Sequence, residues 1–362
     1  KMNIYFLITG LGSGGAERNL LYICENLKNK HNITVVVLGG KNFYSNEFLR
    51  TNCRLVYLEL NKFKFTSFFH FIWEFIKCNS NNTILVSWLY HADLFSILLK
   101  VLKPNIKIFW NIRTAEIGNN YFRYGKVILP ILKYFSYIIP TKIMYNSFRG
   151  KEEHEKYGYK KKGEIVKNIF IPPKKYSIKL KLEHDPSKIY FGFIGRNAPQ
   201  KGIDILLKAF NQFLVKNPHC NLIVAGFEIE NSEFKKYISK NIKFIGKTKD
   251  IRSIYEMLDV FVLPSIYGEG TPNVILEALY FDLPCIGTNV GDISYLLKSG
   301  RGLTINPGDI KSLFNSFNEM LNYLKSNEHL EKNHRQKFIL KNFDKNLSID
   351  QYERKLIYNH AD

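Results

Sequence analysis

The chain has 362 residues, of which 45% are hydrophobic and only 12 are proline. This composition is typical of a folded protein with room for two domains, and it excludes a disordered or low-complexity chain. The formal net charge is +20, and residues 1–175 hold 27 Lys and Arg against 11 Asp and Glu, which is +16 of it. The asymmetry predicts an anionic partner for the first half: an acidic lipid surface, a phosphorylated acceptor or a nucleic acid.

The cysteines and the apolar runs indicate a cytoplasmic chain. Five cysteines are scattered without metal-site or disulfide-framework spacing, so we expect buried, reduced thiols. No apolar run reaches the ~20 residues that span a bilayer. The run over residues 4–8 is too short for a secretory signal peptide and ends in glycines.

Strands and helices alternate along the first half of the chain. A strand is predicted over Asn3–Thr9, a glycine loop follows it, and a helix is expected from Ala16 to about Lys28. Alternation of this kind implies a parallel, doubly wound sheet. The further strands of this half are predicted at residues 33–38, 84–88, 106–110 and 142–145.

The same pattern restarts after a loose segment rich in Pro and Lys over residues 170–188. A strand is predicted over Ile189–Ile194 and a helix from Ile203 to about Lys216, and short strands follow at 222–225, 242–245, 260–263 and 285–287. We therefore expect an α/β chain of two Rossmann-like domains that face each other across a ligand-binding cleft. Their expected bounds are 1–170 and 189–340, with a linker at 171–188 and a C-terminal helix at 341–362 that packs back on the first domain.

The glycine loop after the first strand has three possible roles. Gly10, Gly12 and Gly15 match the G-x-G-x-x-G pattern of dinucleotide-binding proteins. An NAD site also needs an acidic residue at the end of the second strand, and that strand ends in Gly39-Gly40-Lys41. We favour a close-approach loop, whose Gly14 and Gly15 amides face a phosphate or an acceptor, over an NAD site or a plain tight turn.

The second glycine loop, Gly195–Gly202, is not a Walker A loop, because it lacks the Gly-Lys-Ser/Thr order. It places two cations, Arg196 and Lys201, at a strand-to-helix turn. These cations would suit a diphosphate group, although a pair of surface cations is often simply solvated.

Two carboxylates, Glu269 and Glu277, bracket the expected start of a short helix. Thr271 is a good N-cap residue and Pro272 suits the first helical position. The amides of such a helix start would bind an anion, strengthened by the helix dipole. A carboxylate beside a phosphate-binding helix start fits a ligand that carries both phosphate and hydroxyl groups, as a nucleotide sugar does.

The faces of this helix bear on the role of the carboxylates. Asn273 and Glu277 are expected to share a polar face, and the buried face would be formed by Val274, Ala278 and Leu279. The two glutamates could instead be the acid and base or nucleophile of a glycosidase. We favour a positioning role, because Glu277 is expected on a polar helix face and the two cations, Arg196 and Lys201, would suit a diphosphate leaving group, which needs charge neutralisation more than protonation.

Together these residues resemble the retaining GT-B glycosyltransferases of family 4, which build bacterial polysaccharides and glycolipids. Each matching motif is weak by itself, but the set occurs in the expected order over nearly the whole chain. The resemblance implies transfer of a sugar from a nucleotide-diphosphate sugar, with UDP favoured, to a lipid-linked glycan acceptor in surface polysaccharide or lipopolysaccharide synthesis. The matching motifs are Gly14–Arg18, Ser87–Asp93, Gly158–Asn168, Gly195–Gly202, Glu269–Glu277, Gly287–Gly291 and Gly300–Asp309.

The resemblance also implies roles for individual residues. Arg196 and Lys201 would neutralise the donor diphosphate, Glu277 would accept hydrogen bonds from the ribose, and Glu269 would face the donor sugar. His91 would contact that sugar from the first domain, unless it is a histidine packed beside Trp88. The remaining donor contacts would come from Gly14, Gly15, Gly195, Gly270, Thr271, Asn273 and Val274.

The resemblance further implies a metal-independent hexosyltransferase without a cofactor. The chain contains no Asp-x-Asp triplet, and two cations and a helix start would take the place of a metal ion. The departing phosphate would take the acceptor proton, so we name no catalytic base. Arg113 is a further candidate for an acceptor or phosphate contact.

The basic first domain would bind the acceptor. Lysines and aromatic residues over 62–77 and 121–142 would suit an acidic bilayer surface, which predicts a peripheral protein on the inner face of the cell membrane. The alternative for 62–77 is an ordinary crossover helix. Two other functions stay open: a nucleotide-sugar 2-epimerase of the same fold, and a nucleic-acid-binding protein, for which no recognition helix or aromatic RNA motif is present.

Overall fold

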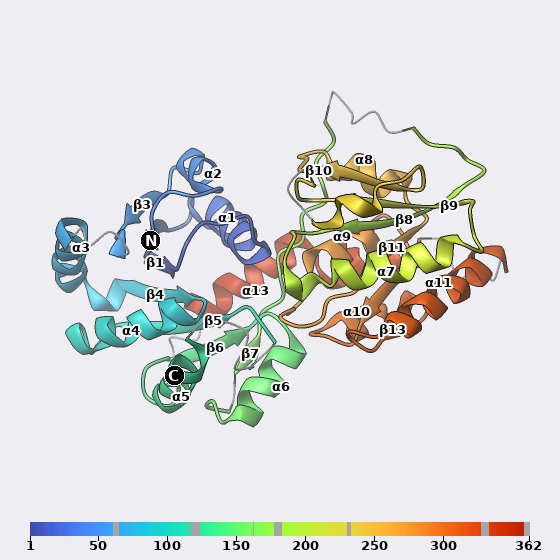
Figure 1. The fold of residues 1–362 in the computed structure, drawn as a ribbon. Helices are drawn as coiled ribbons and strands as arrows, with labels where there is room; N and C mark the ends of the chain where they lie inside the picture. Colours follow the sequence, from blue (N-terminus) through green and yellow to red (C-terminus); the bar gives the residue numbers. More distant parts are fainter. Residues whose placement is uncertain are drawn as a thin grey trace. The chain divides into compact units, whose positions relative to one another are not determined.

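A computed structural model describes residues 1–60, 65–115, 117, 124–161, 163–176, 183–229, 233–326 and 333–357, and the side chain of Phe65 is not among the described parts. The chain divides into two compact units, which are residues 1–169 with 345–362, and residues 170–344. Each unit is built on one parallel sheet (Figure 1).

The first unit has a seven-stranded sheet with the order β3-β2-β1-β4-β5-β6-β7. Every pairing in it is parallel. The sequence did not predict β3 and β7, because these edge strands are only four and two residues long. The strands are β1 Asn3–Ile8, β2 Asn32–Val37, β3 Arg54–Tyr57, β4 Thr83–Trp88, β5 Lys107–Ile112, β6 Lys142–Tyr145 and β7 Glu164–Ile165.

Helices connect these strands on both faces of the sheet (Figure 1). The connections from β3 to β4, β4 to β5 and β5 to β6 all cross the sheet in one direction, so α3, α4 and α5 lie on the same face. The rings of Phe68 on α3 and Phe95 on α4 are 6.1 Å apart. The helices are α1 Gly15–Leu27, α2 Ser45–Arg50, α3 Phe65–Lys77, α4 Tyr90–Leu102, α5 Gly125–Phe135 and α6 Phe148–Tyr157.

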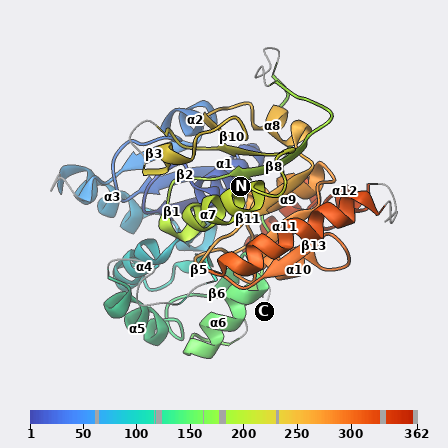
Figure 2. The same ribbon diagram turned by 45° about the vertical axis from the view of Figure 1, so that its right-hand side comes forward.

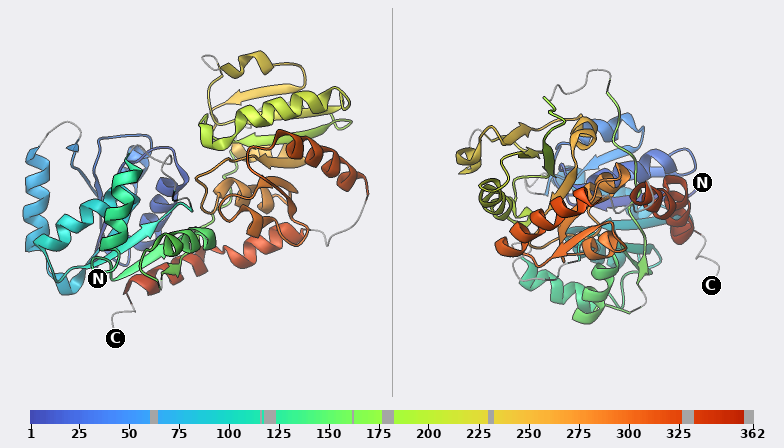
Figure 3. Two further views of the ribbon diagram at one scale, coloured as in Figure 1. Left: turned by 60° about the horizontal axis from the view of Figure 1, so that its bottom comes forward. Right: turned by 90° about the vertical axis from the view of Figure 1, so that its right-hand side faces the viewer.

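The C-terminal helix α13, Lys345–Ile357, belongs to the first unit (Figure 3). Its Tyr352 is buried, and the Tyr352 hydroxyl accepts a hydrogen bond from Nδ2 of Asn111 at 3.2 Å. Lys355 pairs with Glu164 at 3.3 Å, which ties the helix to the edge strand β7. Helix α13 is therefore held by buried side chains, which include Ile349, Tyr352 and Leu356, and by polar contacts at the sheet edge.

The second unit has a six-stranded parallel sheet with the order β10-β9-β8-β11-β12-β13. The sequence did not predict β13, because its four residues are only partly buried and carry no strong apolar pattern. The strands are β8 Ile189–Ile194, β9 Cys220–Ala225, β10 Ile242–Gly246, β11 Val260–Leu263, β12 Cys285–Thr288 and β13 Gly302–Ile305. The prediction of two doubly wound α/β units is confirmed.

Aromatic side chains fill the core of the second unit. Phe191 of β8 packs against Phe210, Phe213 and Phe317, with ring centroids 5.4, 5.8 and 5.4 Å away. These contacts hold α7 and α11 side by side on the sheet (Figure 2). The helices are α7 Ile203–Leu214, α8 Ile251–Met257, α9 Asn273–Tyr280, α10 Ile293–Leu297, α11 Ile310–Lys325 and α12 His334–Asn342.

The strand order of each sheet reverses once. In the first unit β1 is flanked by β2 and β4, and in the second β8 is flanked by β9 and β11. Ligands of doubly wound folds bind outside the carboxyl ends of the strands at such a reversal point. Ligand-binding residues are therefore expected on the loops after β1 and β4 in the first unit and on those after β8 and β11 in the second.

Candidate functional site

In the second unit, the loops after β8 and β11 bring Lys201 and Glu269 together. Nζ of Lys201 donates to Oε1 of Glu269 at 2.6 Å, and Oγ of Ser265 donates to the same oxygen at 2.5 Å. Only 14% of the lysine side chain and 8% of the glutamate side chain are exposed. The sequence treated Lys201 and Glu269 as separate ligand contacts, whereas the structure makes them a largely buried ion pair.

Gly202 lets these two loops approach each other. Its φ is +63°, and a Cβ at this position would lie 2.2 Å from the carbonyl oxygen of Pro264. The amide of Ile266 also donates to the carbonyl of Gln200 at 2.8 Å. Only glycine combines this backbone angle with this clearance, so Gly202 fixes the distance between the turn that carries Lys201 and the strand end that carries Ser265.

Helix α9 begins one residue later than the sequence predicted. Its N-cap is Pro272, without a side-chain capping bond, and Asn273 is the first helical residue. The hydroxyl of Thr271 lies 3.3 Å from Oδ2 of Asp292. The predicted N-cap role of Thr271 is therefore wrong, because Pro272 is the N-cap and the Thr271 hydroxyl donates to Asp292 in the loop after β12.

Glu277 lies on the buried side of α9 and is only 2% exposed. The hydroxyl of Tyr255, on α8, donates to Oε2 of Glu277 at 2.9 Å. The Tyr255 ring stacks on Phe281 with centroids 5.4 Å apart. The prediction that Glu277 lies on a polar face of the helix is therefore wrong. The hydrogen bond from Tyr255 offsets part of the free-energy cost of burying this carboxylate.

The loop after β12 packs against the backbone of Glu269 and Gly270. Gly291 has a φ of +56°, and a Cβ there would lie 2.5 Å from both carbonyl oxygens. The amide of Asp292 donates to the carbonyl of Gly270 at 2.9 Å. Three strand ends thus support the Glu269 segment.

The other predicted residues of this unit lie on the same loops. Arg196 is exposed on the loop after β8, next to Gly195, and it forms no ion pair with another described residue. Asn273 and Val274, in the first turn of α9, are partly exposed. These residues share the strand-order reversal point with Lys201 and Glu269, and their ligand contacts stay a prediction.

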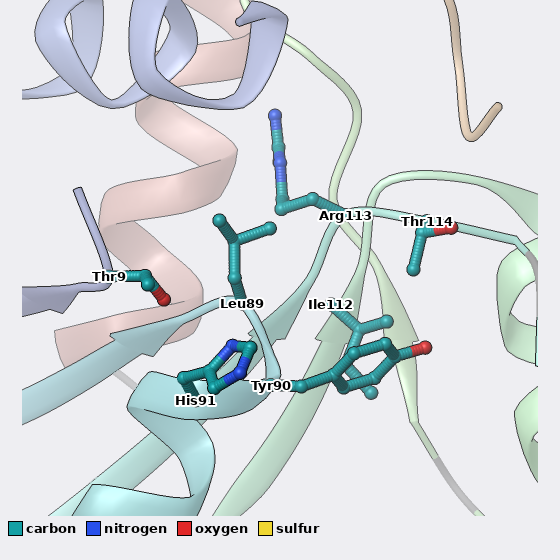
Figure 4. Close-up of a pocket in the computed structure, with 7 residues that line it drawn as sticks. All are labelled: Thr9, Leu89, Tyr90, His91, Ile112, Arg113 and Thr114. Carbon is teal, nitrogen blue, oxygen red and sulfur yellow. The ribbon is translucent and has the colours of Figure 1, made fainter. Parts of the chain in front are cut away.

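A pocket of about 170 Å³ lies in the first unit (Figure 4). It is lined by residues at the carboxyl ends of β1, β4 and β5, which are Thr9, Leu89, Tyr90, His91, Ile112, Arg113 and Thr114. Burial lowers the pKa of His91 below its usual value, so the imidazole is neutral near pH 7. The contact between His91 and a donor sugar remains a prediction.

Arg113 is buried, with 8% of the residue exposed. Its Nη2 donates to Oδ1 of Asn168 at 2.6 Å, and its guanidinium carbon lies 4.7 Å from the centroid of the Trp88 ring. Burial lowers the pKa of Arg113 to about 10, which leaves the group protonated at neutral pH.

Helix α1 begins at Gly15, with Gly14 as its N-cap and no side-chain capping bond. The carboxylate of Glu17 lies against Gly14, and a Cβ on this glycine would be only 2.3 Å from Oε2 of Glu17. The indole Nε1 of Trp88 donates to the carbonyl of Ala16 at 3.2 Å. The glycine loop is thereby tied to β4.

No role was predicted from the sequence for three further residues, of which Ser265 and Tyr255 bond the predicted glutamates and Asp93 bonds Ser87 within the Ser87–Asp93 motif. Ser265 carries a recognisable signal, since it is a hydroxyl residue at the carboxyl end of a strand, where ligand-contacting loops begin. Tyr255 carries none, because its position in the sequence does not reveal that its hydroxyl reaches Glu277. Asp93 is fully buried, accepts a hydrogen bond from Ser87 at 2.5 Å, and has its pKa raised to about 8 by burial.

In the part of the chain that the structure describes, no group of three or more His, Cys, Asp or Glu side chains could hold a metal ion. None of the described helices combines the length and apolar character of a bilayer-spanning helix.

The chain is similar to known glycosyltransferases. Residues 175–337 match the family model described as Glycosyl transferases group 1. The capsular polysaccharide biosynthesis glycosyltransferase CapM of Staphylococcus aureus is 32% identical over 138 residues, which is 36% of this chain and 36% of CapM. A Campylobacter jejuni α-1,4-N-acetyl-D-galactosaminyltransferase, named for a GalNAc-GalNAc-diNAcBac-PP-undecaprenol acceptor, is 25% identical over 299 residues, or 78% of each chain.

Solved structures share the whole fold. HepE of Anabaena, solved in complex with UDP, superposes with a TM-score of 0.80 at 16% identity, covering 98% of this chain and 99% of HepE. A second HepE structure, with UDP-glucose, also has a TM-score of 0.80. The family match over residues 175–337, these relatives and the solved structures agree with the motif resemblance: the chain has the GT-B fold, and its second unit is similar to glycosyltransferases.

Proposed function

We propose that the chain is a retaining, metal-independent hexosyltransferase of family 4 that uses a nucleotide-diphosphate sugar, with a UDP-sugar favoured. The single observation that carries this proposal is the grouping of Lys201, Ser265 and Glu269 at the strand-order reversal point of the second unit. The UDP and UDP-glucose complexes of HepE support the choice of donor.

In this proposal the second unit binds the donor. Arg196 and Lys201 neutralise the diphosphate, with amides of Gly195 and of the first turn of α9 as further donors. Glu277, held by Tyr255, accepts hydrogen bonds from the ribose hydroxyls. Glu269 accepts a hydrogen bond from the donor sugar.

The proposed chemistry needs no protein base. The bond between the anomeric carbon and the diphosphate oxygen breaks, and the acceptor oxygen bonds to the same face of the sugar. The acceptor proton passes to the departing phosphate, whose developing charge Arg196 and Lys201 stabilise. Two fixed cations would supply the charge neutralisation that a metal ion supplies elsewhere.

For the first unit we propose an acceptor role, with a lipid-linked glycan as acceptor and the inner membrane surface as its location. The undecaprenol-linked acceptor in the name of the Campylobacter relative supports this choice. Exposed apolar side chains on the face of α3, α4 and α5 support a membrane contact. They include Phe69, Trp73, Ile76, Leu98, Val101, Val127 and Tyr134.

The test of the donor site is UDP-glucose binding, followed by calorimetry or thermal shift, in Lys201→Ala and Glu277→Ala. Both variants are expected to bind about ten- to a hundredfold more weakly, because each loses a charge-assisted hydrogen bond. Lys208→Ala is the matched control, since Lys208 is an exposed lysine of α7 that pairs with Asp204 at 3.6 Å. Unchanged binding in both test variants would refute the assignment.

The epimerase alternative is not favoured, because the family match and the relatives are glycosyltransferases. Incubation of the protein with UDP-N-acetylglucosamine, with and without a lipid-linked acceptor, separates the two activities. A transferase requires the acceptor for product formation, whereas an epimerase converts the donor without it.

A further inference from the structure

The turn between β4 and α4 holds one residue in a strained backbone conformation. Leu89, the N-cap of α4, has a φ of +77° and a ψ of +156°. Glycine adopts this region freely, whereas a residue with a Cβ atom is strained there. Such residues persist only where the surrounding contacts impose the conformation, and they cluster at active sites and ligand-binding sites. The strain at Leu89 therefore points to a function of this turn.

Hydrogen bonds fix the residues on both sides of Leu89. Before it, Oγ of Ser87 donates to Oδ1 of Asp93 at 2.5 Å, which bridges the turn from β4 to α4. After it, the hydroxyl of Tyr90 is hydrogen-bonded to Nε2 of His154 at 2.6 Å. Asp93 and His154 are fully buried, so these contacts are shielded from water. Leu89 cannot relax between two fixed neighbours.

This turn forms part of the wall of the first-unit pocket (Figure 4). The volume of the pocket, about 170 Å³, exceeds that of apolar cavities of about 150 Å³ that bind benzene, so one six-membered ring fits. The wall is mostly apolar, with Leu89 and Ile112 among the residues that line it. A ring with a hydroxyl group at every position would lose hydrogen bonds to water against such a wall. The pocket is therefore suited to a sugar ring that carries an apolar substituent.

The titratable groups on the pocket wall do not call for a charged ligand. Arg113 donates to Oδ1 of Asn168 at 2.6 Å, and the carboxylate of Glu17 acts on it electrostatically. Burial lowers the pKa of His91, so its imidazole is neutral near pH 7. We therefore expect an uncharged ligand.

We infer that this pocket binds an acceptor hexose that carries a methyl group, and that Leu89 determines this specificity. Acetamido groups and 6-deoxy carbons are the methyl-bearing substituents that hexoses commonly carry. The strained backbone holds the Leu89 side chain on the wall that the methyl group contacts. The inference deepens the proposed function and rests on it only for the acceptor being a sugar.

The first test compares the binding of three monosaccharides to the full chain: N-acetylglucosamine, 6-deoxyglucose and glucose. The first two each differ from glucose in one substituent and carry a methyl group. Burial of that group predicts a dissociation constant about four- to tenfold below that of glucose for at least one of them. Titrations followed by ligand-observed NMR measure the three constants, and the sugar that binds more tightly identifies the source of the methyl group.

Variants of Leu89 test the pocket wall. Leu89→Ala and Leu89→Gly both remove most of the side chain, so the preference over glucose should fall to about twofold or less. Leu340→Ala and Leu340→Gly are matched controls, because Leu340 is a 52% exposed leucine of α12 in the second unit. Both control variants are expected to keep the preference of the wild-type chain.

Melting temperatures without ligand test the strain. At Leu340, inside a helix, the alanine variant should melt above the glycine variant, because glycine is the poorer helix former. At Leu89 the order should be reversed, because only glycine adopts this conformation without strain. A glycine variant that is more stable than the alanine variant and yet lacks the sugar preference is not expected of a leucine that serves packing alone.

Equal dissociation constants for the three sugars, or no binding of any of them, would overturn the inference, and so would a preference that survives in both Leu89 variants. A Leu89→Ala variant that melts above Leu89→Gly would contradict the role of the strained turn. The donor assignment is tested separately, since it depends on UDP-glucose binding to Lys201→Ala and not on these sugars.

Discussion

At the scale of single residues, two carboxylates of the proposed donor site each accept a hydrogen bond from a neutral hydroxyl group. Ser265 donates to Oε1 of Glu269 at 2.5 Å, and Tyr255 donates to Oε2 of Glu277 at 2.9 Å. Among the described residues, every hydrogen bond of the Glu269 side chain falls on its Oε1. The arrangement orients Glu269 with its other carboxylate oxygen left for a ligand.

Ser265→Ala tests this orientation. The variant keeps the ion pair with Lys201 but loses the second hydrogen bond that fixes the Glu269 carboxylate. We expect UDP-glucose to bind about three- to tenfold more weakly, whereas UDP binding changes little, because Glu269 is proposed to contact the sugar alone. Calorimetry with the two ligands measures the ratio, and an equal loss for both would contradict the proposed role of Glu269.

Asp93 provides a prediction on pH. Burial raises its pKa to about 8 in the folded chain, above the value of an exposed carboxyl, and the hydrogen bond from Ser87 lowers it only in part. The folded state thus holds the proton more tightly than the unfolded state. The protonated Asp93 therefore contributes fully to the free energy of unfolding below the pKa of the unfolded chain, and this contribution is lost as the pH rises towards about 8.

Asp93→Asn removes this titration while it keeps a similar shape. We expect the free energy of unfolding of the variant, measured relative to the wild-type chain, to increase with pH. The increase between pH about 5 and pH about 8 should be on the order of a few kcal/mol. Denaturant unfolding at both values measures it. The same difference at both pH values would show that Asp93 does not titrate in this range.

At the scale of elements, glycines determine how closely the site loops approach one another. Gly291 has a positive φ of +56°, and its backbone packs directly against the carbonyl groups of Glu269 and Gly270. Gly308 also has a positive φ, of +81°, but a Cβ there would meet nothing within 4 Å. The two positions separate the cost of the backbone angle from the cost of the close contact.

Gly291→Ala is expected to destabilise the chain by more than Gly308→Ala, which should cost only about 1 kcal/mol for its backbone angle. Gly291→Ala must also displace the Glu269 segment, so UDP-glucose binding should fall with it. Chemical denaturation and calorimetry on both variants provide the comparison. Equal losses of stability would contradict the tight contact.

The helices and strands differ in how well the sequence predicts them. Long apolar strands such as β1 and β8 and the helix α7 follow directly from their residues. The short edge strand β7 does not, because two residues carry no periodicity and are ordered by the pairing with β6. The start of α9 differs from the prediction for a tertiary reason, since the Thr271 hydroxyl contacts Asp292 of another loop and Pro272 is the N-cap.

At the scale of the whole molecule, the excess positive charge lies in residues 1–175, which carry +16 of the net +20. The same part of the chain exposes aromatic side chains on α3, where Phe69 is 63% and Trp73 is 55% accessible. Basic charge beside exposed aromatic residues is typical of proteins that bind the surface of an acidic bilayer.

Flotation with liposomes tests this property. We expect the chain to float with vesicles that contain an anionic lipid and not with neutral ones, and added salt should weaken the binding. Phe69→Ser with Trp73→Ser should reduce flotation, whereas Val215→Ser, at an 82% exposed apolar position of the second unit, should not. Equal flotation with neutral and anionic vesicles would exclude a charge-driven contact.

The sequence by itself determined the α/β class and the two doubly wound units, because hydrophobic periodicity and glycine loops are local properties, and it named the residues that we propose for the donor site. The tertiary structure alone decided which of these residues touch. It paired Lys201 with Glu269, buried Glu277 against Tyr255, and left Arg113 against Trp88 and Asn168. Such contacts join residues far apart in the chain, and they depend on the order and spacing of strands, which no local pattern encodes.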